Sequence, residues 1–184
     1  MKPRIPTRKL VVCAMIAAAY TALCLVLMPL SYGAVQVRAA EALTLLPVYS
    51  PVAIWGLSLG CALSNLVGFF SGANPLGLID TLFGTAATLI AAVISYALRD
   101  LRLRGLPVAA AIPPILCNAV ILGLEFTFLE MGGMHLGLFA FNAAAIALGQ
   151  AVSCIGLGLP LVYFLDKSGV AKRFFTFDPL TENI

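Results

Sequence analysis

The sequence predicts an all-α integral membrane protein, and three observations point to this fold class. Hydrophobic residues make up 61% of the 184 residues, charged residues make up only 10%, and the apolar residues are gathered into long runs. A soluble domain has about a quarter of its residues charged. This chain carries too few charges to cover a globule in water, so we expect lipid to surround a single membrane domain of residues 1–184.

Five apolar blocks are long enough to hold membrane-crossing helices. They cover residues 10–30, 43–71, 75–98, 106–131 and 136–165. The first block is longer than the apolar core of a secretory signal peptide, and no A-x-A cleavage site follows it, so we expect a retained helix. The third block opens with Asn74-Pro75, which is typical of a helix N-cap followed by a first-turn proline.

Basic residues indicate that the first three blocks make four crossings. Lysines and arginines gather before the first block, after the third and after the fifth: Lys2, Arg4, Arg8 and Lys9; Arg99, Arg102 and Arg104; and Lys167, Lys172 and Arg173. Short loops rich in Lys and Arg stay in the cytoplasm. An even number of crossings must then separate the first two clusters, which places both termini on the cytoplasmic side of the cell membrane.

The second block is the one that can be divided. As one helix its 29 residues would span about 43 Å, against a hydrocarbon core of about 30 Å. It also contains Pro47 and Pro51, and proline breaks a helix interior. We therefore expect six transmembrane helices, of which the second is short and interrupted by proline, at about residues 10–30, 39–47, 51–70, 75–98, 106–130 and 136–165.

Polar side chains within the expected spans are concentrated toward the outer surface. An ionisable group in hydrocarbon is costly and by default marks a functional site. Three acids and four amides lie at mid-depth or in the outer halves: Glu41, Asp80 and Glu125, with Asn65, Asn118, Asn142 and Gln150. The cytoplasmic halves hold mostly small and aliphatic residues, so the pattern predicts a polar pocket that opens outward.

Two plainer interpretations of these polar residues stay open. The amides could form hydrogen bonds between helices that only stabilise their packing. Arg38 and Glu41, three residues apart, could form an exposed helical pair.

Nothing in the sequence predicts a catalytic residue, a metal site, a cofactor or a nucleic-acid-binding face. The segment Gly56-Leu57-Ser58-Leu59-Gly60 matches a nucleophile elbow, but that motif needs a strand-to-helix turn with a histidine in reach. The sole histidine, His135, is expected at the opposite surface. We interpret the two glycines as a face on which another helix packs closely.

Small residues form a second stripe, at Ala14, Ala18 and Ala22 in the first helix. Alanines spaced by four let a second helix approach backbone to backbone. Inside one domain such a stripe is common, so by itself it identifies no partner.

Two segments of the chain resemble the QueT family of membrane proteins. The first is VRAAEALTLLP at residues 37–47, and the second is NPLGLIDTLFGT at residues 74–85. A looser match covers ALGQAV at 147–152 and GLP at 158–160. The chain departs from the family where we expect a glutamate and find Gln150, which puts an anionic role at that position in doubt.

The resemblance implies the function of a substrate-binding S component in an energy-coupling factor transporter for queuosine precursors, and no enzyme activity. In such transporters a transmembrane coupling subunit docks on an alanine stripe of the first helix, here Ala14, Ala18 and Ala22, and two ATPase subunits supply the energy. The chain itself contains no G-x-x-x-x-G-K-[ST] phosphate loop, so it cannot hydrolyse ATP by the usual route. Transport is thought to occur by toppling of the S component in the membrane.

Queuosine precursors carry a 7-deazaguanine ring, whose N1–H and 2-amino groups form a parallel pair of donors. A carboxylate accepts such a pair bidentately, so Asp80 or Glu125 is expected to bind that edge. The amides Asn118, Asn142 and Gln150 are expected to form hydrogen bonds with the remaining carbonyl and ring positions. At the mouth of the pocket Glu41 is expected to contact ligand, and Arg38 to hold a gating segment closed by pairing with it.

The alternatives are an S component for another flat heterocyclic micronutrient, a six-helix membrane enzyme, or a scaffold subunit. An enzyme should place a nucleophile or metal ligands near a base at one depth. A scaffold should have no affinity for a small molecule.

Overall fold

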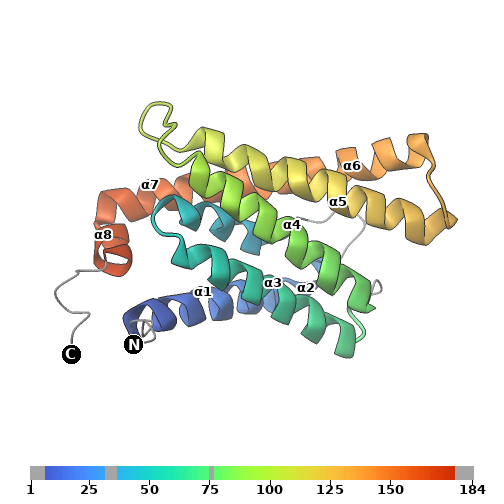
Figure 1. The fold of residues 1–184 in the computed structure, drawn as a ribbon, viewed down its shortest axis with the longest axis horizontal. Coiled ribbons are helices and arrows are strands. Elements are labelled where there is room, and N and C mark those ends of the chain that lie inside the picture. The colour runs from blue at the N-terminus through green and yellow to red at the C-terminus, as the bar shows by residue number, and fades with distance from the viewer. Residues whose placement is uncertain (1–6, 32–36, 75–76, 177–184) are drawn as a thin grey trace, which may run out of the picture.

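The structure is a computed structural model that describes residues 7–31, 37–74 and 77–176, and its described part is built from helices (Figure 1). Five helical segments are long and apolar enough to cross a membrane, which confirms the predicted all-α membrane fold. A sixth segment, η1, is apolar but short. The elements are α1 (Thr7–Val26), α2 (Met28–Ser31), η1 (Ala39–Val48), α3 (Val52–Phe70), α4 (Gly77–Ala97), η2 (Val108–Ala111), α5 (Ile112–Met131), α6 (Leu136–Ala151), η3 (Val152–Gly158), α7 (Leu159–Ser168) and α8 (Val170–Phe175).

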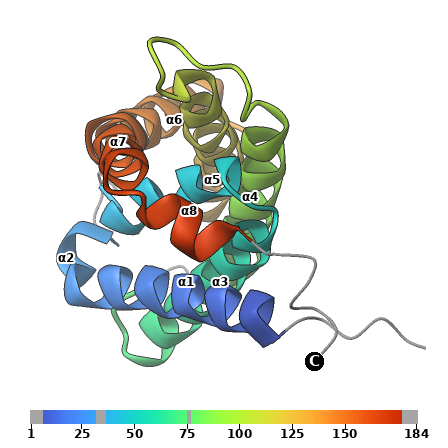
Figure 2. The same cartoon turned by 90° about the vertical axis from the view of Figure 1, so that its left-hand side faces the viewer.

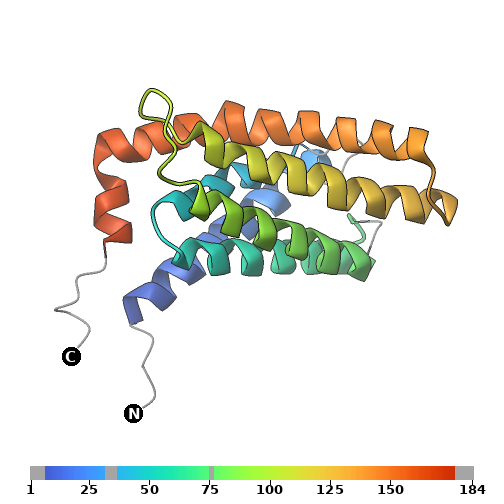
Figure 3. The ribbon, with the colours of Figure 1, turned by 45° about the horizontal axis from the view of Figure 1, so that its top comes forward.

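The long helices form a bundle with two distinct ends. At one end, which we call the basic end, Arg8 donates a hydrogen bond to the backbone carbonyl of Arg173 and Arg102 pairs with Asp166. The far end is where α3 and α5 finish. Helices α1, α3 and α5 run from the basic end to the far end, and α4 and α6 run back (Figure 3).

The second apolar block is divided as predicted, but the break lies after η1 and directly before α3, at Pro51 and not at Pro47, which η1 contains. The structure has a helix at Ala39–Val48 and another at Val52–Phe70, where the sequence predicts 39–47 and 51–70. Between them the ring of Tyr49 stacks on Phe175, and its hydroxyl donates to Asp166, 2.9 Å away. η1 therefore ends at the basic end of the bundle, and α3 begins there.

η1 is a 3₁₀ helix and not the α-helix that a short apolar segment suggests. With three residues per turn, side chains at i and i+3 lie one above the other. Arg38, Glu41 and Thr44 have this spacing, and all three are buried. The sequence pattern predicts that a helix lies here, but it does not distinguish the two helix types.

The first helix is shorter than expected, because α1 ends at Val26 where the sequence predicts helix to residue 30. A turn at Leu27 and the four-residue α2 follow. Pro29 has no N–H to donate to the carbonyl four residues earlier, so the α-helical ladder is interrupted there. The prediction of Asn74 as an N-cap involves Pro75, which lies outside the described residues.

The glycine pair of α3 packs against α1, as predicted. A Cβ atom at Gly56 would lie 2.8 Å from the carbonyl oxygen of Cys13, and one at Gly60 would lie 2.8 Å from the Cβ of Tyr20. Both distances are shorter than van der Waals contact, so a side chain at either glycine would push the two helices apart. Ser58 donates to the carbonyl of Ile54 in its own helix, as an ordinary helical serine does.

The last long helix contains a widened segment. α6, η3 and α7 form one continuous rod from Leu136 to Ser168, in which η3 has π-helical geometry (Figure 3). Pro160 lies two residues after the end of η3 and cannot donate to the preceding turn, which favours such a bulge. A Cβ at Gly158 would lie 2.9 Å from the side chain of Leu45, so this glycine lets η1 pack closely against the rod.

Candidate functional site

Asp80 is the most firmly held of the predicted site residues. It lies in the first turn of α4 and is fully buried. Its Oδ2 accepts a hydrogen bond of 2.6 Å from the amide of Asn74, and its backbone carbonyl accepts one of 3.0 Å from Asn65 on α3. Among the described residues, Oδ1 has no hydrogen-bond partner. Asp80 thus presents one oxygen of a fixed carboxylate to the interior.

Gly84 provides the space beside that oxygen. It lies one turn after Asp80 on α4, and a Cβ there would be 3.1 Å from Asp80 Oδ1 and 2.9 Å from the amide nitrogen of Asn65. A side chain at this position would press on both groups. The glycine therefore keeps the carboxylate oxygen accessible within the bundle.

Arg38 brings a buried positive charge to the same place. Its side chain is 3% exposed, and its Nη2 lies 3.9 Å from Asp80 Oδ2, which joins η1 to α4. Nη1 also lies 3.9 Å from the sulfur of Cys61 on α3. The exposed surface pair that was one interpretation of Arg38 and Glu41 is therefore excluded, because both residues are buried.

Glu41 lies one 3₁₀ turn after Arg38 and is oriented by α1. Its Oε1 accepts a hydrogen bond of 2.5 Å from the hydroxyl of Tyr20, and its Oε2 has no partner in the described part of the chain. The backbone carbonyl of Glu41 accepts from Thr44 and from the thiol of Cys154. The predicted pairing of Glu41 with Arg38 as a gate stays a prediction.

Glu125 is buried on α5 without a partner of its own. The residue is 6% exposed, and neither carboxylate oxygen forms a hydrogen bond or an ion pair within the described ranges. It lines a hollow of about 460 Å³ between α4 and α5, together with apolar side chains that include Phe83 and Phe128. Asp80 and Arg38 are the charged groups that act on it electrostatically.

The amides divide between the two interpretations that the sequence left open. The Nδ2 of Asn142 donates to the hydroxyl of Thr127, 3.5 Å away, and this contact between α6 and α5 fits a hydrogen bond that stabilises helix packing. Gln150 accepts from the thiol of Cys154 one turn further along, near the backbone of Glu41. Asn118 lies two turns before Glu125 on α5, and its Nδ2 has no partner among the described residues.

Buried polar atoms without an assigned hydrogen bond gather in this region, and most of those in the described part of the chain are oxygens. Among the described residues they include five carboxylate or amide oxygens, of Glu41, Asn65, Asp80 and Glu125, the last with both of its oxygens. Hydroxyl groups of α4 add to the set: Thr81, Thr85 and Thr88. Buried polar groups in native proteins are nearly always hydrogen-bonded. The arrangement is therefore suited to a ligand that supplies N–H donors.

Sequence reasoning missed two side chains that organise the cluster. Tyr20 was part of an apolar run, and nothing in the local pattern separates it from a core aromatic residue. Asn74 is predicted only as a helix cap, and the hydrogen bond from its side chain to Asp80 was not foreseen. The position of Asn74, a polar residue six positions before the intramembrane Asp80, is a signal that could have indicated its role.

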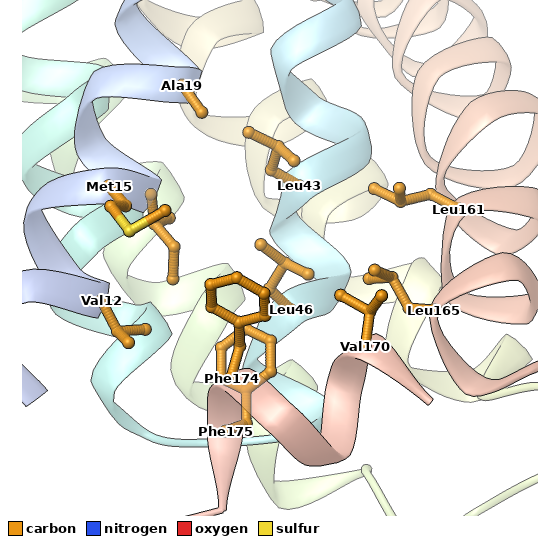
Figure 4. Close-up of a pocket in the computed structure, with 11 residues that line it drawn as sticks. Val12, Met15, Ala19, Leu43, Leu46, Leu161, Leu165, Val170, Phe174 and Phe175 are labelled. Carbon is orange, nitrogen blue, oxygen red and sulfur yellow. The ribbon is translucent and has the colours of Figure 1, made fainter. Parts of the chain in front are cut away.

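A separate apolar groove of about 220 Å³ lies toward the basic end. Leu43 and Leu46 of η1 lie between α1 on one side and α7 on the other, and α8 crosses below them (Figures 2 and 4). Met15 and Leu165 form part of the two walls (Figure 4). The alanines Ala14, Ala18 and Ala22 are exposed on α1 beside this groove.

Comparison with protein families gives one match that covers most of the chain. The family described as QueT transporter matches residues 10–167. No curated protein and no solved structure gives a significant match.

Proposed function

Because the chain belongs to the QueT transporter family, we propose that it is the substrate-binding S component of an energy-coupling factor importer. The family implies a membrane transporter that handles a small molecule, and not an enzyme. The proposed ligand is a queuosine precursor of the 7-deazaguanine type. The observation that carries this proposal is the buried cluster around Asp80, in which carboxylate and amide oxygens have no hydrogen-bond partner among the described residues.

The proposed orientation places the basic end in the cytoplasm and the polar cluster toward the outside. Arg99, Arg102 and Arg104 then lie on the same side as Arg8 and Arg173, in keeping with the bias of lysine and arginine toward the cytoplasm. η1 is proposed as the second of six crossings. The cell membrane is the proposed location.

Asp80 is the carboxylate that we assign to the ring edge. A residue that recognises a flat edge must be held in one orientation, and Asp80 is fixed by Asn74 and Arg38. Each carboxylate oxygen has more than one lone pair, so Asp80 can accept both N1–H and the 2-amino group while it keeps its protein contacts. Asn118, Asn142 and Gln150 are proposed to complete the polar lining, and Glu41 to contact ligand from η1.

Binding to purified protein in detergent tests this function. The compounds are 7-deazaguanine, which has the donor pair, and 7-deazaadenine, which lacks it but has the same bicyclic ring. We expect 7-deazaguanine to bind at least about 100-fold more tightly by calorimetry, since two charge-assisted hydrogen bonds are lost in the other compound. Equal affinity, or no binding of either compound, would contradict the proposal. Native mass spectrometry of the protein as purified would then identify the heterocycle that it carries.

The coupling subunit is proposed to dock on α1 beside the apolar groove. Ala14, Ala18 and Ala22 are exposed there and carry no bulky side chain, so a helix can approach closely. The groove walls from α1 and α7 extend the apolar surface next to them. The two ATPase subunits would bind through the coupling subunit, since this chain has no phosphate-binding loop.

Ala18→Phe tests the docking surface. We expect the variant to lose co-purification with the coupling and ATPase subunits, because the ring prevents close backbone approach, and to keep its affinity for ligand. Ala144→Phe is the control, since Ala144 is an exposed alanine on α6. Unchanged recovery of the complex with Ala18→Phe, or equal loss with both variants, would place the interface elsewhere.

A further inference from the structure

The apolar groove between α1 and α7 leads to basic side chains at the basic end of the bundle. On α1 its wall is formed by Val12, Met15 and Ala19, whose spacing places them on one face of the helix. Arg8 lies one turn before Val12 on that same face and is exposed. Over roughly 16 Å of helix the wall therefore passes from a guanidinium to apolar side chains only.

α8 brings further positive charge to the same end of the groove. Its Val170 and Phe174 line the groove, whereas Lys172 and Arg173 are exposed (Figure 4). The guanidinium of Arg8 donates a hydrogen bond to the backbone carbonyl of Arg173, which holds α8 against the start of α1. Basic side chains from two distant parts of the chain thus meet where the groove ends.

The acidic side chains described at this end have cations or donors of their own. Asp166 on α7 accepts from Arg102 at 3.1 Å and from the hydroxyl of Tyr49 at 2.9 Å, and Asp100 lies 3.6 Å from Arg99. The segments outside the described residues, 1–6 and 177–184, add two bases and two acids to the sequence: Lys2 and Arg4, and Asp178 and Glu182. Positive charge therefore exceeds negative charge around α8 and the start of α1.

The lining of the groove suits a hydrocarbon chain better than a second helix. Helices that pack against each other in membranes use small residues, whereas Ala19 is the one small side chain among the described residues that line this groove. The others are mostly leucine, valine and phenylalanine. Met15 is 51% exposed and Phe174 is 40% exposed, so the groove opens to the surroundings of the bundle. A flexible acyl chain can follow such an uneven apolar surface.

We propose that the groove and its basic end form a binding site for one anionic phospholipid. An acyl chain lies along η1 between α1 and α7, and the phosphate lies at Lys172 and Arg173, where charge-assisted hydrogen bonds to its oxygens are strong. Basic pockets between transmembrane helices are known to bind anionic headgroups. In the proposed orientation this lipid belongs to the cytoplasmic leaflet. The site is separate from the polar cluster around Asp80 and binds lipid whatever the chain transports.

Native mass spectrometry of the protein in detergent tests the headgroup contacts, with phosphatidylglycerol and phosphatidylcholine of identical acyl chains as probes. We expect the first phosphatidylglycerol to bind at least about tenfold more tightly than phosphatidylcholine. In the double variant Lys172→Gln with Arg173→Gln this preference should fall to within about threefold. Arg104→Glu lowers the net charge by the same amount at an exposed loop position and should behave as wild type. An unchanged midpoint of thermal unfolding checks that the double variant folds.

Ala19→Phe tests the place of the acyl chain. The ring would occupy the groove between α1 and η1, so we expect the affinity for phosphatidylglycerol to fall at least about fivefold, since apolar contact with the chain is lost. Ala144→Phe makes the same change at an exposed position on α6 and should leave lipid affinity unchanged.

Three outcomes would overturn the lipid site. Equal affinity of wild-type protein for the two lipids would remove the headgroup contacts, and an equal loss in Arg104→Glu would show a general effect of charge. Normal lipid binding by Ala19→Phe and by the double variant, with loss of co-purification of the coupling subunit, would mean that the groove holds a protein helix instead. None of these measurements uses 7-deazaguanine, so the proposed function is judged separately.

Discussion

Asp80→Ala is expected to abolish tight binding of 7-deazaguanines, with affinity at least about 100-fold below wild type, because the two charge-assisted hydrogen bonds to the ring edge are lost. The carboxylate is held by Asn74 and by Arg38, so no neighbouring group can replace it without rearrangement. Isothermal titration calorimetry on protein in detergent measures the effect directly. A retained affinity within about threefold would remove Asp80 from the site.

A conservative variant and a remote one serve as controls for Asp80. Asp80→Asn keeps the shape of the side chain and removes its charge, so it should bind more weakly than wild type while folding normally. Asp100→Asn makes the same chemical change at a side chain that is 83% exposed, and it should leave affinity unchanged. If Asp100→Asn weakened binding as much, the loss at Asp80 would reflect a general effect of charge.

Arg38→Met is expected to lower stability strongly. It removes the one buried positive charge of the described cluster and leaves Asp80 and Glu41 as buried carboxylates. Removing one partner of a buried ion pair typically costs about 3–5 kcal/mol. We expect a clear fall in the midpoint of thermal unfolding, followed by fluorescence of detergent-solubilised protein in the absence of ligand.

The double variant Arg38→Met with Asp80→Asn tests the physical reason for that loss. If unpaired charge is the cause, neutralising Asp80 should recover part of the stability, so the double variant should be more stable than Arg38→Met alone. Additive losses in the two single variants would mean that the 3.9 Å pair contributes little. Arg38 would then stabilise the protein through packing.

The fold class and the division of the second apolar block could be predicted, because both depend on properties that a sequence shows directly. Composition and run length indicate lipid exposure, and Pro51 lies at the break between η1 and α3, although η1 continues through Pro47. The close packing of Gly56 and Gly60 on α1 followed from their spacing by four. These are local features, and local patterns identify them.

The organisation of the polar cluster could not be predicted, because it depends on contacts between distant parts of the chain. Tyr20 reaches Glu41 across 21 residues, and Arg38 reaches Asp80 across 42 positions, as their numbers give. η1, which begins directly after Arg38 and contains Glu41, likewise packs against the distant elements α1, α4 and η3. The spacing of three residues between Arg38 and Glu41 fits an exposed pair on a helix equally well.

A structure of the protein bound to 7-deazaguanine tests the central claim most directly. We expect the N1–H and 2-amino groups to lie within hydrogen-bond distance of the Asp80 carboxylate, under η1 and between α4 and α5. Density for the ligand in the apolar groove between α1 and α7, or a ring edge that faces no carboxylate, would contradict it.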